Sequence, residues 1–128
     1  MRAGSSSDTI AVMRTVLIVD DHEAFRESAS ALLDSEGFEV VGQAADGGAA
    51  IAEARRLRPQ VVLVDIQLPD LDGFVVAERL TAMADPPLVV LVSSREASVY
   101  GPRLQTAPAR GFITKRELSG QALAALVV

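Results

Sequence analysis

Several residue types are scarce in this chain, and their scarcity excludes several classes of protein. Its 128 residues include no cysteine, which rules out disulfide bonds and thiolate metal sites. No apolar run approaches the ~18–20 residues that a membrane span requires. The amino-terminal segment also lacks the apolar stretch of a secretory signal. We therefore expect a cytoplasmic protein that makes no membrane contact.

Positive charge is scarce as well. The chain carries 12 basic against 17 acidic residues, a net charge of -5, and its arginines are scattered except for Arg55, Arg56 and Arg58. Direct binding of nucleic acid needs a basic face, so we expect none. Lysine is the rarest cation, because Lys115 is the single lysine beside eleven arginines. Because every other member of the Lys+Arg set is arginine, we expect the ammonium group of Lys115 to have a specific role.

The composition that is present fits one globular domain. Hydrophobic residues make up 49% of the chain and charged residues 23%, which is enough for a core at this length. Residues 1–13 are small, polar and without periodicity, so we expect a flexible leader followed by a domain over 14–128.

From Arg14 onward, short apolar runs alternate with helical patterns. The expected strands are 14–20, 38–44, 61–65, 88–93 and 110–114. The expected helices are 22–35, 47–57, 73–83 and 117–126, with a further one in 97–107. Gly101 and Pro102 interrupt that segment, and proline inside a helix costs ~3 kcal/mol, so this fourth helix should be short or broken.

This alternation predicts an α/β fold, a doubly wound parallel sheet of five strands with about five helices on its two faces. Four strands end in polar groups, whereas 38–44 does not. That strand fits an edge, as in the flavodoxin-like order 2-1-3-4-5. Ligands bind at the carboxyl ends of the strands in such sheets. The polar groups expected at that edge are Asp20, Asp21, Asp65, Ser93 and Lys115.

Three carboxylates at one edge repel each other. Two unit charges 4 Å apart cost about 4 kcal/mol at an effective dielectric of 20, so a cation must offset them. Mg²⁺ prefers oxygen ligands, and Asp21, Asp65 and the backbone carbonyl of Gln67 could supply them, with Asp20 acting mainly through a water. Such a site suits phosphoryl transfer. Asp65 is the best candidate nucleophile, because an Asp carboxylate can accept a phosphoryl group and become an aspartyl phosphate.

These residues resemble the receiver domain of two-component response regulators. The resemblance rests on Asp20 and Asp21, on the Asp-x-x-x-Pro-x-x-Asp-Gly pattern of residues 65–73, and on Ser93 and Lys115. It covers residues 14–126. The Asp-x-x-x-Pro-x-x-Asp-Gly segment together with the Asp pair and the lysine, in this order, is a highly specific combination.

The resemblance implies a role for each of these positions. Asp65 accepts a phosphoryl group from a sensor histidine kinase or a phosphotransfer protein, and Lys115 binds a phosphoryl oxygen. Ser93 is the switch hydroxyl and Phe112 the switch aromatic. Asp20, Asp21, Asp65 and the Gln67 carbonyl organise Mg²⁺. The chain is then a phosphoacceptor that assists its own phosphorylation and dephosphorylation, and not an enzyme.

Some positions depart from the family pattern. Position 93 is serine where threonine is commoner, and Arg116 follows Lys115 where many receivers have proline. The break at Gly101 and Pro102 falls in the family's signalling face, here residues 97–126. The resemblance implies a homodimer through that face, and because of the break we expect it to depart from the family's usual dimer mode.

Other interpretations stay open at this point. A haloacid-dehalogenase-like Mg²⁺-dependent phosphatase uses similar groups, but its nucleophile follows the first strand. A flavin carrier needs a phosphate cradle, and the acidic loop after the first strand has the wrong sign for one. Asp72 could be a helix cap, and Phe112 could be an ordinary core residue. Ser93 could simply satisfy backbone groups at the end of a strand. His22 could start a helix or contact a kinase. The chain ends soon after its last helix, so we expect a stand-alone receiver or one severed from an output domain.

Overall fold

The computed structural model describes residues 13–127 and contains one five-stranded parallel sheet. The strands lie in the order β2-β1-β3-β4-β5, which confirms the predicted topology. Their bounds are β1 (Arg14–Val19), β2 (Phe38–Ala44), β3 (Val61–Asp65), β4 (Leu88–Ser93) and β5 (Gly111–Thr114). Every residue of the central strand β3 is buried, because helices cover both faces of the sheet.

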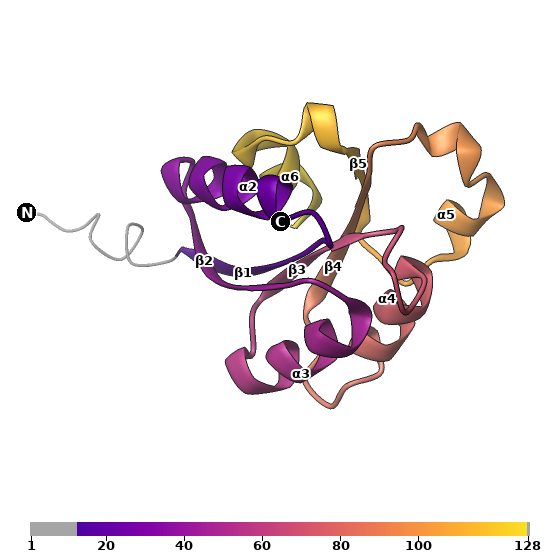
Figure 1. Ribbon diagram of the computed structural model, residues 1–128, viewed down its shortest axis with the longest axis horizontal. Coiled ribbons are helices and arrows are strands. Elements are labelled where there is room, and N and C mark those ends of the chain that lie inside the picture. The colour runs from indigo at the N-terminus through magenta and orange to yellow at the C-terminus, as the bar shows by residue number, and fades with distance from the viewer. Residues whose placement is uncertain (1–12, 128) are drawn as a thin grey trace, which may run out of the picture.

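Two helical layers enclose the sheet, as Figure 1 shows. Helices α2 (Glu23–Ser35) and α6 (Gly120–Leu126) lie on one face, and α3 (Gly47–Leu57) and α4 (Gly73–Thr81) lie on the other. Successive side chains of a strand point to opposite faces, so each strand feeds two cores. Val16 and Ile18 pack with Leu33 of α2, whereas Leu17 and Val19 pack with Ala50 of α3.

The fourth helix is broken, as the sequence predicts. A 3₁₀ turn, η1 (Ala97–Val99), is followed by Gly101 at φ +57 and by the short helix α5 (Pro102–Thr106). The positive φ suits glycine, and proline at the first helical position needs no backbone donor. The segment thus changes direction at Gly101 and restarts.

The expected bounds of two helices are wrong. The last helix begins at Gly120 and not near Glu117, because Lys115–Glu117 form a 3₁₀ turn, η2, and Leu118 is extended. The Ser119 side chain then accepts a hydrogen bond from the Ala122 backbone N–H and caps α6. Helix α4 ends at Thr81, two residues before the expected 83.

Within residues 13–127, no helix combines the length and apolar character needed to cross a bilayer. The predicted leader, residues 1–13, falls almost entirely outside the described residues, which begin at Met13.

Candidate functional site at the carboxyl ends of the strands

The structure brings together acidic groups from two neighbouring strands. Asp20 follows β1 directly and Asp65 is the last residue of β3, and these strands pair in parallel. Both carboxylates are buried. The Asp65 Oδ1 atom accepts the backbone N–H of Gln67 at 3.2 Å, which holds the start of the following loop against the carboxylate.

Lys115 lies between these two carboxylates. It follows β5, and its Nζ atom is 2.6 Å from Asp20 Oδ2 and 3.3 Å from Asp65 Oδ2. Its side chain is 17% exposed, and its ammonium also lies 4.6 Å from the centre of the Phe25 ring. The buried Asp20 Oδ2 accepts no well-aligned hydrogen bond from the described residues, so it relies on this ion pair. The single lysine of the chain therefore offsets one of the two negative charges of a buried acidic pair.

Asp21 and His22 complete the mouth of the acidic cluster. The Asp21 side chain is 36% exposed and that of His22 is 71% exposed. The His22 Nδ1 atom lies 3.2 Å from Asp20 Oδ1 and 3.1 Å from Asp21 Oδ1. Its backbone N–H donates to Asp20 Oδ1 at 2.8 Å. His22 precedes α2, as predicted, but no sequence pattern indicates that its ring contacts both carboxylates.

The donor set at this edge fits a divalent cation that prefers oxygen. Asp20, Asp21, His22 and Asp65 each offer a ligand atom, and all four atoms lie within 4.8 Å of one another. Three of these donors are carboxylate oxygens, which are the hard ligands that Mg²⁺ selects. Among the described residues the buried Asp20 Oδ2 has only the Lys115 ammonium as a partner, and that ammonium is shared with Asp65, so the cluster has room for a further positive charge.

The burial of charge perturbs the protonation of this site. Burial, followed by repulsion from Asp20, raises the pKa of Asp65 from 3.8 to about 6, although Lys115 opposes the shift. Burial alone would lower the pKa of Lys115, but its contacts with Asp20 and Asp65 outweigh burial and raise that pKa. Lys115 therefore stays charged, whereas the ionised form of Asp65 costs the folded protein free energy.

This cost predicts how the stability of the metal-free protein depends on pH. A carboxyl whose pKa is higher in the folded state binds its proton more tightly there, so protonated Asp65 stabilises the fold. That contribution is complete below pH 3.8 and is lost as the pH rises through about 6. We expect the advantage of Asp65→Asn in unfolding free energy to grow between these values and then level off. Urea denaturation of both proteins in EDTA measures it, and a constant difference from pH 4 to 7 would contradict it.

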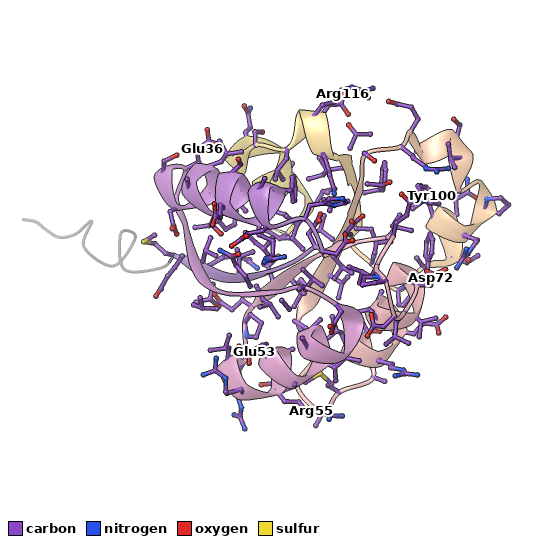
Figure 2. All side chains as sticks on the ribbon, viewed as in Figure 1. Glu36, Glu53, Arg55, Asp72, Tyr100 and Arg116 are labelled. Carbon is purple, nitrogen blue, oxygen red and sulfur yellow. The ribbon has the colours of Figure 1, made fainter. Side chains whose placement is uncertain are left out.

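The remaining predicted residues lie around this cluster. Ser93 is buried at the end of β4, but its hydroxyl contacts Tyr100 and not Asp65 in the described residues. Phe112 of β5 is partly buried against the core. Asp72 caps α4, as predicted, by accepting the Phe74 N–H at 2.7 Å. Figure 2 places Asp72 and Tyr100 on the side of the molecule where α4 and α5 lie.

Sequence reasoning did not single out Tyr100, whose hydroxyl contacts Ser93. It lies in the interrupted segment between η1 and α5, where no hydrophobic periodicity predicts which side chains point inward. The one available signal was its type, since it is the only tyrosine of the chain.

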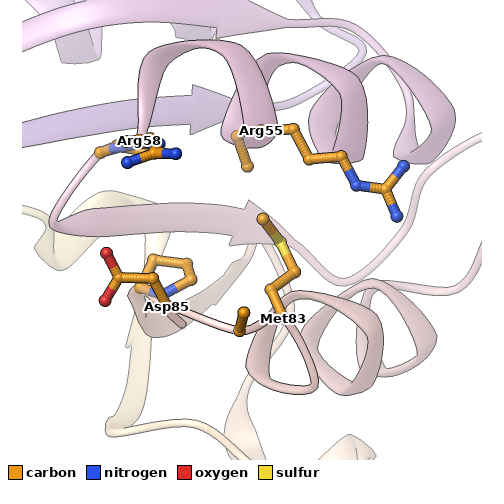
Figure 3. A pocket seen from close by; sticks show the side chains of 8 residues that line it. Arg55, Arg58, Met83 and Asp85 are labelled. Carbon is orange, nitrogen blue, oxygen red and sulfur yellow. The ribbon is translucent and has the colours of Figure 1, made fainter.

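A separate pocket lies at the edge of the sheet opposite the acidic cluster. Figure 3 shows this pocket, about 430 Å³ in volume, between the end of α3 and the segment that leads into β4. Arg55, Arg58, Met83 and Asp85 are among its lining residues. Its lining includes none of the acidic groups described above, so it is separate from the acidic cluster.

Comparison with known proteins identifies the family to which the chain belongs. A family model described as the response regulator receiver domain matches residues 16–127 of the chain. The chain belongs to this family. Its fold and its acidic edge are therefore those of a receiver domain of two-component systems, and the family match gives no support to a phosphatase or a flavin carrier.

Related receivers occur in longer proteins of different kinds. The chain is 38% identical over 104 residues to the response regulator GacA of Pseudomonas protegens, covering 80% of this chain and 49% of GacA. It is 42% identical over 109 residues to protein-glutamate methylesterase/protein-glutamine glutaminase 6 of Anaeromyxobacter dehalogenans, covering 84% and 31%. The chain thus spans half or less of the length of these curated relatives.

Solved receiver structures have the same shape. The response regulator domain of Thermotoga maritima CheB is 28% identical, with a TM-score of 0.75, and the match covers 90% of this chain and 94% of that one. A LuxR-family two-component response regulator from Aurantimonas sp. SI85-9A1 is 26% identical, with a TM-score of 0.81 and coverage of 91% and 86%.

Proposed function

We propose that this receiver accepts a phosphoryl group on Asp65 from a phosphohistidine of a sensor histidine kinase or a phosphotransfer protein, in a reaction that requires Mg²⁺. The observation that carries the proposal is the contact of one ammonium, Lys115, with two buried carboxylates, Asp20 and Asp65. An Asp carboxylate in such a site is activated by positioning and by charge neutralisation.

Each site residue then has a task. Asp20, Asp21, Asp65 and the backbone carbonyl of Gln67 would hold Mg²⁺, which when bound supplies positive charge against the transferred phosphoryl oxygens. An Asp65 oxygen forms the new bond to phosphorus while the phosphorus–nitrogen bond of the donor histidine breaks. The departing imidazole keeps the electron pair of that bond and takes up a proton. Lys115 stays protonated and moves from Asp65 Oδ2 toward the incoming oxygens.

The readout of the phosphoryl group involves two further positions. Ser93 would donate its hydroxyl to a phosphoryl oxygen, and Phe112 would change its packing in response. An inactive and an active conformer are in equilibrium before phosphorylation, and the new contacts of Ser93 and Lys115 with the phosphoryl group shift it toward the active one. The face formed by residues 97–126 is the surface that we propose for a homodimer, and we propose no direct contact of this domain with nucleic acid.

A small phosphodonor tests the proposed function without knowledge of the kinase. Purified protein is treated with acetyl phosphate, with Mg²⁺ or with EDTA, and its intact mass is measured. We expect one added phosphoryl group in Mg²⁺ and none in EDTA, because the carboxylates repel an anionic donor when no metal is bound. Failure to add any group in Mg²⁺, or equal addition in EDTA, would refute the proposal.

A further inference from the structure

The hydroxyl of Ser93 already has two partners in this structure. Its Oγ atom is 2.6 Å from the Tyr100 hydroxyl and accepts the Arg95 backbone N–H at 3.0 Å. Ser93 is fully buried, so water does not compete for these bonds. A serine hydroxyl has one proton and two acceptor lone pairs. Both partners come from the segment after β4, and no hydrogen bond joins this hydroxyl to Asp65 among the described residues.

Tyr100 is itself braced by two other elements. Its ring centre lies 5.9 Å from that of Phe74, at the start of α4, and 6.1 Å from that of Phe112 on β5. Both pairs are steeply inclined, at 64° and 60°, which is a favourable arrangement for aromatic rings. The Tyr100 side chain thus contacts residues of β4, α4 and β5. Its ring packs against α4 and β5, and its hydroxyl contacts Ser93 of β4.

Contacts of Arg103 also hold the same segment against the loop that follows Asp65. The Arg103 guanidinium of α5 lies 4.1 Å from the centre of the Phe74 ring and donates to Asp72 Oδ2 at 2.8 Å. Asp72 precedes α4, whose first residue, Gly73, donates its N–H to Ile66 O at 2.8 Å. The segment Ala97–Thr106 is therefore docked against the structure that carries the phosphoacceptor.

We propose that Tyr100 is a positioning residue, which holds the Ser93 hydroxyl while Asp65 is unphosphorylated and is released when the phosphoryl group takes that hydroxyl. This inference rests on the proposed function. Phe112 occupies the position of the family's switch aromatic but has no hydroxyl, so it cannot make this bond. The aromatic part of the switch is thus divided between Phe112 and Tyr100, and the segment Ala97–Thr106 moves with Tyr100.

The Ser93 hydroxyl has a single proton, so when it donates to Tyr100 it cannot donate to a phosphoryl oxygen, and the two contacts oppose each other. Any interaction that keeps Tyr100 on Ser93 disfavours phosphorylation, and phosphorylation disfavours the Tyr100 contact by the same factor. Tyr100→Phe keeps the ring contacts and removes only the hydroxyl. A neutral hydrogen bond of this kind shifts an equilibrium by about 2- to 10-fold, so we expect labelling by acetyl phosphate to be faster by about that factor.

The composition of the chain supplies a direct readout. Tyr100 is the only tyrosine and there is no tryptophan, so ultraviolet emission of the protein reports on Tyr100 alone. We expect this emission to change with the same time course as the appearance of the phosphorylated mass. We also expect unphosphorylated Ser93→Ala, in which Tyr100 has lost its partner, to show a change of the same sign.

A double substitution separates positioning through Ser93 from a merely structural effect. In a Ser93→Ala background, Tyr100→Phe should have no further effect on the labelling rate, because its partner is already gone. Val99→Ala is the matched control, since Val99 precedes Tyr100, is 56% exposed and should label at the wild-type rate. Circular dichroism establishes that each variant is folded.

The outcomes distinguish this inference from the proposed function. If wild-type protein gains no phosphoryl group, the proposed function fails. If it is labelled but its tyrosine emission stays constant, or Tyr100→Phe is labelled at the wild-type rate, the role of Tyr100 is refuted and the proposed function stands. An undiminished effect of Tyr100→Phe in the Ser93→Ala background also refutes it.

Discussion

Asp65→Asn should abolish labelling by acetyl phosphate while leaving the fold intact. Asparagine has nearly the shape of aspartate, but its neutral amide is not a nucleophile and cannot form the acyl phosphate. The substitution also removes one of two buried charges that repel each other, so the variant should unfold at a higher urea concentration than wild type at pH 7. Intact mass after treatment in Mg²⁺ measures the labelling.

The chain offers a matched control for this substitution. Asp46 is a helix cap that accepts the Ala49 N–H at 2.7 Å and takes no part in the acidic cluster. Asparagine caps helices as well as aspartate does, so Asp46→Asn should fold and be labelled like wild type. A phosphoryl group that still appears in Asp65→Asn, on any other residue, would show that the wrong carboxylate has been assigned.

Gly73→Ala should be severely destabilising. A Cβ atom at this position would lie 2.5 Å from both the carbonyl oxygen of Asp65 and the Cα atom of Ile66. These are backbone atoms of β3 and the loop after it, so they cannot rotate away as a side chain would. Overpacking of this severity should lower the free energy of unfolding by about 3 kcal/mol, a large part of the total for a domain of this size.

Gly48→Ala is the control for that prediction, because its nearest neighbours would be carboxylate oxygens at 3.6 and 3.7 Å. Alanine is favoured over glycine in a helix, so this variant should be as stable as wild type or slightly more so. Urea denaturation compares the two. Equal midpoints for Gly73→Ala and Gly48→Ala would mean that the start of α4 is not held against Asp65 as the structure shows.

The sequence was sufficient to predict the sheet and the convergence of its polar ends. Four strands are continuous apolar runs, because both faces are covered, and each is followed directly by a polar residue. The run that lacks such a residue, 38–44, fits an edge of the sheet, as in the flavodoxin-like order. Asp20, Asp65 and Lys115 could therefore be placed at one edge by topology alone, and the structure does bring them into contact.

Other features were beyond sequence reasoning, for identifiable reasons. The contact between Ser93 and Tyr100 depends on how the chain turns at Gly101, and a positive φ at one residue leaves no periodic trace. The start of α6 depends on a hydrogen bond of Ser119, which competes with the helical pattern that begins at Glu117. The His22 ring contacts two carboxylates because of its rotamer, which local sequence does not determine.

The placement of Lys115 has a practical consequence for immobilising this protein. Reagents that acylate amines attack the neutral form, and Lys115 is both shielded and held in its ammonium form by two carboxylates. Coupling chemistry directed at amines should therefore leave Lys115, and with it the acidic pocket, chemically unmodified.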